Sequence, residues 1–339
     1  MVRPSGDRKP KVRGATKSEY QAKLMIDLDV VVVNWNAGNQ LSDCLLSLAL
    51  ACQNSVFQLS KCTVVDNAST DGSTDSLGDL PLRPELIKNR ANAGFATASN
   101  QGASAGSASY ILFLNPDVRL FPDSLTKPLL FLSEPANAAL GILGVQLVDE
   151  DGTIQRNVAR FPTPGDLFFQ MLGFDRLWPR RFPPLFLLEW DHAENRAVDQ
   201  VPGAFFLVRR SLFERLHGFD QRFFMYFEDL DLAYRASQAG FGSYYLADAR
   251  VFHRGGGTTV RVKANRLFYI LRSRAQYVAK HYGVRAGLEI ILACISVEFW
   301  MRFLWSWLRF SPKNSLETVQ AYLMFLKDLP KLLKELEAG

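Results

Sequence analysis

The chain has 339 residues, of which 48% are hydrophobic and 22% are charged, and a formal net charge of +5. This length and composition support a sizeable hydrophobic core arranged in one or two domains. The 4 cysteines are scattered without metal-ligand spacing, which excludes a disulfide framework and indicates a reducing cytoplasm, and the lack of any uncharged apolar run of about 18 residues argues against a conventional membrane span.

The positive charge is concentrated at the start of the chain. Residues 1–26 are rich in lysine and arginine, and only Asp7 and Glu19 oppose them before residue 24. We expect this stretch to be a disordered basic tail. Because it contains no apolar central segment, we do not expect it to be a secretory signal.

The first predicted elements form a strand, a helix and a strand. Residues 28–33 are apolar and mostly β-branched apart from Asp29, which is typical of a buried strand. Apolar residues then recur at helical spacing over about 39–52, with Asn39 as the expected N-cap, and residues 62–65 form the next strand. This order predicts two parallel strands joined by a right-handed crossover, as in nucleotide-binding sheets.

Polar residues end four successive strands of this predicted sheet. A short strand at 86–88 precedes a helix of small residues that runs to about 106, and a buried strand at 110–114 follows. The polar residues at the four strand ends are Asn34, Asp66, Asn89 and Asn115. Carboxyl ends of parallel strands meet at one edge of a sheet, where ligands bind, so we take Asp117 as the anchor of an active site there. A simple turn at Pro116 and Asp117 is the alternative.

The middle of the chain is less regular. We expect a helix from near Pro122, a strand at 140–148, a tight turn at 149–152 and another strand at 201–208. Residues 161–196 are rich in Pro, Phe and Trp without a clear period, which predicts a long loop that folds over the site.

Three carboxylates, Glu228, Asp229 and Asp231, stand in the first turn of the next predicted helix. Favourable interaction with the helix dipole is one explanation for them. The aromatic run at 223–227 supports another, because an apolar wall raises the pKa of a carboxyl group towards that of a useful base. We expect Glu228 to orient an acceptor and Asp231 to play a structural role, paired with Arg235.

His253 follows a further strand-like segment and precedes three glycines. A lone histidine is more often structural than a ligand, but the glycines permit a close approach of the backbone to phosphate. An aspartate and a histidine, with phosphate oxygens and water as the other ligands, suit Mg²⁺ or Mn²⁺ better than Zn²⁺.

The C-terminal part carries a second signal. Residues 288–310 are very apolar but are interrupted by charged residues such as Glu298 and Arg302, which predicts an interfacial helix rather than a spanning one. Packing of this helix on the rest of the protein is the alternative. Basic residues upstream are expected to meet a lipid diphosphate or anionic headgroups; they are Arg266, Arg272, Arg274 and Lys280. A second amphipathic helix is expected at 316–329, followed by a solvated end at 331–337.

Taken in order, these motifs resemble those of the family 2 inverting glycosyltransferases over about residues 27–275. The motifs are Asn34-Trp35-Asn36, residues 65–73, residues 92–96, Asn115-Pro116-Asp117, Gly203-Ala204, residues 228–231 and His253. The most similar branch is that of the bacterial rhamnosyltransferases that act on lipid-linked or polysaccharide acceptors. The resemblance implies the α/β GT-A fold, with a nucleotide-binding, mostly parallel sheet flanked by helices. It places the catalytic domain at 27–265 and a helical, membrane-associating region at 266–339.

The resemblance also implies roles for individual residues. Those matched to nucleotide-sugar binding are Asn34, Asn36, Asp66, Asn92, Gly94, Phe95, Asn115 and Asp117. Asp117 and His253 correspond to metal contacts and Asp229 to the catalytic base. Asn115 stands where the fuller Asp-x-Asp pattern has its first aspartate. From the residues themselves we expect Glu228, Arg272 and Arg274 to bind the acceptor.

The resulting hypothesis is an inverting glycosyltransferase that depends on Mg²⁺ or Mn²⁺. It moves L-rhamnose from dTDP-rhamnose to a hydroxyl of a lipid-linked or polysaccharide acceptor, for cell-envelope glycan synthesis, and is peripheral on the cytoplasmic face of the cell membrane. The alternatives are a UDP-sugar donor (galactofuranose, galactose or N-acetylglucosamine) and a nucleotide-binding module without catalysis. A dinucleotide-dependent oxidoreductase is disfavoured because no Gly-x-Gly-x-x-Gly follows the first strand. No nucleic-acid partner is expected.

Overall fold

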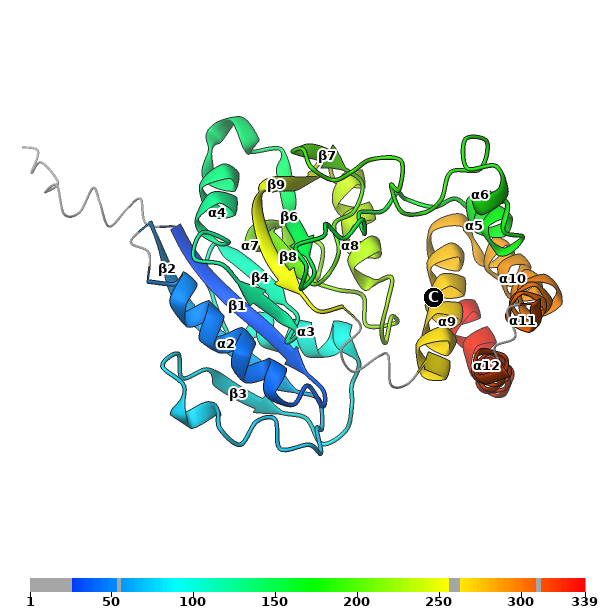
Figure 1. Ribbon diagram of the computed structural model, residues 1–339, viewed down its shortest axis with the longest axis horizontal. Coiled ribbons are helices and arrows are strands. Elements are labelled where there is room, and N and C mark those ends of the chain that lie inside the picture. The colour runs from blue at the N-terminus through cyan, green and yellow to red at the C-terminus, as the bar shows by residue number, and fades with distance from the viewer. Residues whose placement is uncertain (1–25, 54–55, 256–262, 309–311, 339) are drawn as a thin grey trace, which may run out of the picture.

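The computed structural model describes residues 26–53, 56–255, 263–308 and 312–338 (Figure 1). The basic tail predicted at 1–26 therefore lies outside the described residues except for Ile26, which already begins the first strand. Two of the three glycines after His253 also lie outside them.

Within the described residues, nine strands form one sheet, which is the centre of the molecule (Figure 1). The strands are β1 (Ile26–Asn34), β2 (Phe57–Asp66), β3 (Glu85–Lys88), β4 (Tyr110–Leu114), β5 (Val118–Leu120), β6 (Leu140–Val148), β7 (Arg196–Val198), β8 (Phe205–Arg209) and β9 (Gly242–His253). Their order across the sheet is β3-β2-β1-β4-β8-β6-β9-β5, and β7 pairs with β9. The sheet is parallel from β3 to β4, as predicted for the nucleotide-binding half. Beyond β4 the pairing is mixed, because β8 runs antiparallel to both β4 and β6.

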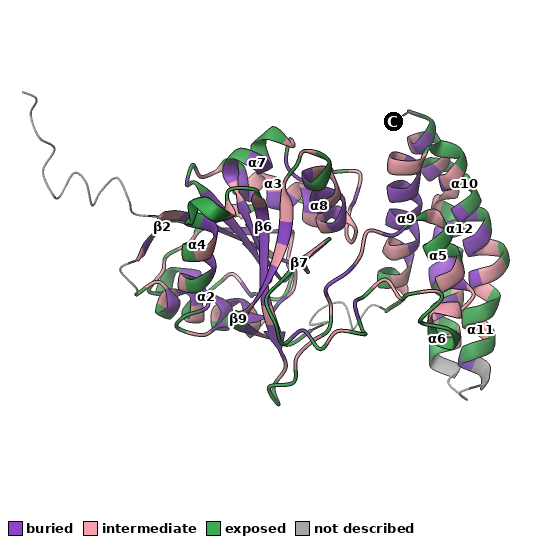
Figure 2. Ribbon diagram, turned by 90° about the horizontal axis from the view of Figure 1, so that it is seen from above, coloured by how far each residue is buried: buried purple, intermediate pink, exposed green. Residues whose placement is uncertain are grey.

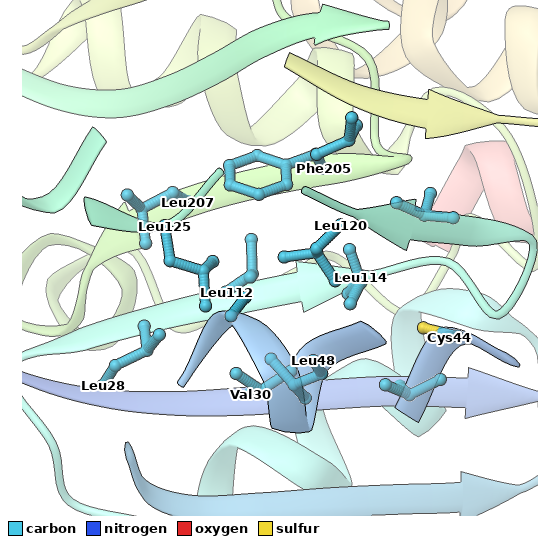
Figure 3. Packing of buried hydrophobic residues seen from close by; sticks show 14 of the residues in the cluster. Leu28, Val30, Cys44, Leu48, Leu112, Leu114, Leu120, Leu125, Phe205 and Leu207 are labelled. Atoms are coloured by element: carbon cyan, nitrogen blue, oxygen red, sulfur yellow. The ribbon is translucent and has the colours of Figure 1, made fainter. Parts of the chain in front are cut away.

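Helices cover both faces of this sheet. They are α2 (Asn39–Ala51), α3 (Phe95–Ser104), α4 (Thr126–Ser133), α7 (Arg210–Arg215) and α8 (Glu228–Gln238). One core cluster joins α2 and α4 to one face of the sheet (Figure 3), and a second joins α3, α7 and α8 to the other face. The central strands β4 and β8 are buried on both faces, which explains their almost entirely apolar sequences.

A helical region lies beside the sheet (Figure 2). Its helices are α5 (Pro164–Met171), α6 (Phe174–Leu177), α9 (Lys263–Tyr282), α10 (Val284–Ala293), α11 (Phe299–Leu308) and α12 (Pro312–Ala338), with a π-helical turn at Cys294–Glu298. A third core cluster joins α5, α9, α10 and α12 and includes Phe223 and Leu230 from the region of α8. None of the helices in the described part of the chain is both long and apolar enough to cross a membrane.

Three predicted elements differ from the structure. The expected loop at 161–196 contains α5 and α6, and α5 begins at a capping box in which Thr163 and Asp166 bond reciprocally. The helix expected near Pro122 begins at Thr126. The solvated end expected at 331–337 is helical, with Leu332 and Leu336 buried against the other helices.

Candidate active site

A buried amide–carboxylate pair joins the carboxyl ends of β1 and β2. Asn34 and Asp66 lie opposite each other in the parallel register. The Asn34 side-chain nitrogen donates to Asp66 Oδ1 at 2.9 Å and to Ser73 Oγ at 2.8 Å. Since both residues are buried, Asn34 fixes the Asp66 carboxylate and the loop that follows it.

The loop after β1 is tied to the loop after β2. Asn36 has a φ of 52° in the left-handed region, and its Oδ1 accepts a hydrogen bond from Thr70 N at 2.8 Å. Its own backbone N–H donates to Ser69 Oγ at 2.9 Å. These hydrogen bonds therefore join the two loops into one layer at the edge of the sheet.

The loop before α3 is held from two sides. Asn67 Oδ1 accepts from Ala93 N, and Asn67 Nδ2 donates to Gly94 O, both at 3.1 Å. Gly94 has a φ of 85°, and a Cβ added to it would come within 2.5 Å of Phe224 O. Because only glycine fits both this backbone and this contact, the loop lies closely against the segment that leads to α8.

Asp117 and His253 face each other across the β5–β9 pair, where Val118 lies opposite His253. Asp117 Oδ1 is 3.6 Å from His253 Nε2, and both side chains are largely buried. Burial lowers the pKa of His253, although the charge of Asp117 acts in the opposite direction. The imidazole is therefore neutral at neutral pH.

The surroundings of His253 also fix its tautomer. Gln155 Nε2 donates to the His253 carbonyl at 2.7 Å, which turns Gln155 Oε1 towards His253 Nδ1 at 2.9 Å. Since an amide oxygen only accepts, Nδ1 carries the proton. Nε2 is therefore an acceptor that lies 3.6 Å from a carboxylate oxygen of Asp117, and two acceptors this close are an arrangement that a cation or a proton would stabilise.

Asp229 sits in the first turn of α8 and is held by three donors. Its Oδ2 accepts from Gly203 N at 3.0 Å and from Gln200 Nε2 at 2.8 Å, while its Oδ1 accepts from Leu230 N at 2.8 Å. Burial raises the pKa of Asp229, and these hydrogen bonds oppose the rise. The carboxylate is thus fixed in place, with a basicity above that of an exposed aspartate.

The pKa values of the neighbouring Glu228 and Asp229 are shifted by different surroundings. Burial and the neighbouring Asp229 charge raise the pKa of Glu228 well above its ordinary value. Glu228 Oε2 is buried and has no hydrogen-bond partner among the described residues, whereas Asp229 has three donors. Of the two, Glu228 is thus the more readily protonated, while the three donors favour the ionised form of Asp229.

Asp231 is fully buried and attaches α8 to α9. It pairs with Arg235 at 2.7 Å, with Lys280 at 2.5 Å and with His281 at 2.8 Å. Burial acts to raise the pKa of Asp231, but His281, Arg235 and Lys280 outweigh it and lower the pKa to about 2. This arrangement agrees with the structural role expected for Asp231.

The two arginines expected at the acceptor are both paired with carboxylates. Arg272 contacts Asp328 at 2.8 Å and Glu335 at 2.5 Å, and it joins α9 to α12. Arg274 is buried against Glu298. Lys280, expected in the same basic group, is bound to Asp220 and Asp231. These contacts stabilise the helical region.

One cavity of about 1040 Å³ connects the sheet edge to the helical region. Asp117 and Asp229, more than a hundred positions apart in the chain, both line it. The other predicted site residues that line it are Asn92, Phe95, Asn115, Glu228, His253 and Arg274. Five predicted site residues in the described part of the chain do not line the cavity: Asn34, Asn36, Asp66, Gly94 and Arg272. The first four lie at the strand ends or in the loops just described.

Several lining residues carry no predicted role. Trp35 and Asn67 belong to motifs that the sequence already indicates, directly after strand ends. Arg176, Arg302 and Trp305 come from α6 and α11. No sequence signal relates these three to the sheet edge, because the packing of the helical region brings them there.

The glycosyl transferase family 2 model matches residues 29–217, which is more than half of the chain. The matched stretch runs from within β1 to beyond β8 and so covers the parallel half of the sheet and the Asn115-Pro116-Asp117 turn.

Two relatives and one solved structure agree with this match. A Mycobacterium tuberculosis protein named N-acetylglucosaminyl-diphospho-decaprenol L-rhamnosyltransferase is 33% identical over 271 residues, covering 76% of this chain and 85% of the relative. Rhamnosyltransferase WbbL of Escherichia coli is 30% identical over 172 residues, covering 50% of this chain and 62% of the relative. The mannosyltransferase PcManGT from Pyrobaculum calidifontis, solved with GDP-Man and Mn²⁺, has a TM-score of 0.53 at 15% identity, with coverage of 89% of this chain and 87% of that one. The chain is therefore a glycosyltransferase with the GT-A fold, and it belongs to glycosyl transferase family 2.

Proposed function

We propose that the protein transfers L-rhamnose from dTDP-rhamnose to a hydroxyl of a lipid-linked glycan acceptor in cell-envelope glycan synthesis, with inversion. The observation that carries this is the shared cavity, in which Asp117 and Asp229 both take part. Its volume of about 1040 Å³ lies at the upper end of the usual range for ligand sites, so it has room for a donor and an acceptor sugar. The relatives named as rhamnosyltransferases support the choice of sugar, and the name of the first supports a diphospholipid acceptor.

Asp229 is proposed as the general base. An acceptor hydroxyl is a poor nucleophile and must lose its proton as it attacks the anomeric carbon. Asp229 is ionised, fixed by three donors and raised in pKa by burial, which suits it to take that proton. Attack on the face opposite the departing diphosphate gives inversion.

Asp117 and His253 are proposed to hold a Mg²⁺ or Mn²⁺ ion. The fit rests on the acceptor lone pairs that the two side chains turn towards each other. In the described part of the chain no group of three or more His, Cys, Asp and Glu side chains is arranged for a metal, so phosphate oxygens and water would complete the coordination. When bound, such an ion acts as a Lewis acid that neutralises the charge of the departing diphosphate.

The remaining residues are proposed to shape the donor site. Asn34, Asn36, Asp66 and Gly94 hold the loops in place, and Asn92, Phe95 and Asn115 line the cavity beside the nucleotide sugar.

We also propose a division between a catalytic domain at 27–265 and a helical region at 266–339, to which α5 adds its apolar face.

We further propose that the helical region binds the inner face of the cell membrane. The polarity of the π-turn and α11 is inverted relative to an ordinary surface helix: Glu298 is buried against Arg274, whereas Trp300 and Leu304 are 61% and 50% exposed. Leu288 and Leu292 on α10 are also exposed. An apolar face of this size marks an interaction surface, and its tryptophan suits a membrane interface.

Replacing Trp300 and Leu304 by serine is expected to abolish flotation of the protein with anionic liposomes. Both side chains are exposed, so the melting temperature should stay within about 2 °C of the parent. The matched control is Leu46→Ser with Leu50→Ser, an exposed pair at the same spacing on α2. If the Trp300/Leu304 variant floats as well as the control variant, this face does not anchor the protein.

A panel of sugar nucleotides tests the transfer itself. With N-acetylglucosaminyl-diphospho-polyprenol as acceptor and Mg²⁺ or Mn²⁺ present, dTDP-rhamnose is expected to give a rhamnosylated lipid, detected by mass spectrometry, with anomeric inversion detected by NMR. UDP-galactofuranose, UDP-galactose and UDP-N-acetylglucosamine should give at most a few per cent of that product. Product from one of these UDP-sugars and none from dTDP-rhamnose would replace the proposed donor.

A further inference from the structure

The cavity has two chemically different ends. The sheet end carries the carboxyl groups of Asp117, Glu228 and Asp229. The other end lies between α6, α9, α11 and α12, and its charged residues are mostly arginines. A ligand that fills the cavity therefore meets an acidic wall at one end and a basic wall at the other.

The basic end is built from two facing stripes. Arg266, Ile270 and Arg274 recur every four residues and form one face of α9, about 12 Å long. Glu298 and Arg302 recur at the same spacing on the π-turn and α11, and both line the cavity.

Glu298 is shared between two arginines. It pairs with the buried Arg274 through one oxygen and with Arg302 at 2.8 Å through the other. One carboxylate therefore faces two guanidinium groups, and Arg302 remains 44% exposed at its side chain. Arg266 adds a further exposed cation from α9.

The α6 side adds another arginine. Arg176 lies over the Trp305 ring at 5.9 Å, which brings α6 against α11. Its neighbour Asp175 and Glu298 are the two carboxylates at this end of the cavity. Among the described lining residues there, four arginines (Arg176, Arg266, Arg274 and Arg302) face these two carboxylates, so positive charge is in excess.

We propose that this end is a binding site for the diphosphate of the lipid-linked acceptor, with Arg302, Arg266 and Arg176 as its contacts. The site is separate from the donor diphosphate site at Asp117 and rests on the proposed function. Guanidinium groups bind phosphate oxygens through charged, directional hydrogen bonds. Met301 and Trp305 line the cavity and are also partly exposed, so they offer the start of the lipid chain a path to the outward apolar face of α11.

The placement favours an acceptor diphosphate over an anionic lipid headgroup. A headgroup would meet the outward face of α11, which presents Trp300 and Leu304. The three arginines instead line the cavity that also contains Asp229. A diphosphate bound there leaves its attached sugar directed into the cavity, towards the proposed base.

Binding of farnesyl diphosphate, a short prenyl diphosphate, tests the site without any need for transfer. With the donor site saturated by dTDP and Mg²⁺, the parent protein is expected to bind farnesyl diphosphate in calorimetry and farnesol at least tenfold more weakly. Arg302→Gln should weaken farnesyl diphosphate binding about tenfold or more, and Arg302→Lys should restore part of it. The matched control is Arg285→Gln, which removes an exposed arginine that also pairs with a glutamate four residues away.

Kinetics separate this proposal from the proposed function. Where the parent protein transfers sugar, Arg302→Gln should raise KM for the diphospholipid acceptor about tenfold and leave KM for the donor and for a phosphate-free alkyl glycoside acceptor unchanged. Equal losses with both acceptors, or unchanged farnesyl diphosphate binding, overturn the diphosphate site. Reduced flotation with phosphatidylglycerol vesicles but unchanged farnesyl diphosphate binding assigns Arg302 to headgroups and also overturns it. A parent that binds farnesyl diphosphate through Arg302 but transfers no sugar contradicts only the proposed function.

Discussion

Replacing Asp229 by asparagine is expected to lower kcat about 10²–10⁴-fold while the affinity for the nucleotide sugar stays the same. The side chain keeps its size and its place at the start of α8 but loses the negative charge that would take the acceptor proton. The three donors to Asp229 come from Gly203, Gln200 and Leu230 and not from the loops after β1 and β2, so the substitution should leave those loops in place. Turnover is measured with the best donor of the panel, and affinity by calorimetry with the same donor.

Glu228→Gln is the matched control for Asp229→Asn. Burial and the Asp229 charge raise the pKa of Glu228 and so favour its neutral form, which glutamine imitates. Its kcat should fall less than tenfold. The parent enzyme should also lose activity as the pH falls through the raised pKa of Asp229, because the base acts only when ionised. Unchanged turnover in Asp229→Asn would exclude this residue as the base.

The sheet edge of this site follows from local sequence patterns. Predominantly apolar stretches identify the strands at 28–33, 110–114 and 140–148, and the structure extends only the first, by three residues. Parallel pairing then brings the polar residues after each strand to one edge, as Asn34 and Asp66 illustrate. These inferences succeed because they need only short-range periodicity and the rule that parallel strands end together.

The partners of the site residues do not follow from such patterns. β5 has only three residues, too few for a periodic signal, yet its pairing with β9 sets Val118 opposite His253 and so brings the preceding Asp117 to within 3.6 Å of the imidazole. Arg272 finds its carboxylates 56 and 63 residues further on, at Asp328 and Glu335. A basic stretch therefore resembles a ligand site in the sequence, although tertiary packing has already neutralised two of its arginines.

One missed helix did have a local signal. Thr163-Pro164 followed by Asp166 combines an N-cap, a proline at the first helical position and a capping-box acid. The aromatic composition of 161–196 hides the start of this helix, because the helix is too short to show a clear apolar period. Its apolar face packs against α9 and α10 and not against the sheet. The consequence is functional, since α5 and α6 form one wall of the cavity.

Asp231→Asn is expected to lower the free energy of unfolding by about 3–5 kcal/mol, because it leaves buried cations without their counter-charge. Asp231 is fully buried among Arg235, Lys280 and His281. The effect depends on pH with a definite sign. The folded-state pKa of Asp231 is lowered from 3.8 to about 2, so its stabilisation is fully present above about pH 4 and is lost as the pH falls towards 2. Urea denaturation should therefore show the largest difference from the parent near pH 7 and a smaller one near pH 3.

The contrast with Asp229 makes this last prediction specific. The two aspartates are two positions apart in the same helical turn, yet one faces the cavity and the other faces α9. Asp229→Asn should remove turnover with the smaller loss of stability, since its amide group can still accept at one of the two former carboxylate oxygens, whereas Asp231→Asn should lose more stability by weakening the attachment of α9 to α8. The exposed Asp151→Asn serves as the neutral reference for both measurements. Because Lys280 also contacts Asp220, a parental unfolding free energy in Asp231→Asn would mean that Asp220 and the apolar contacts of Phe223 and Leu230 suffice to hold the helical region, and that the Asp231 ion pairs add nothing measurable.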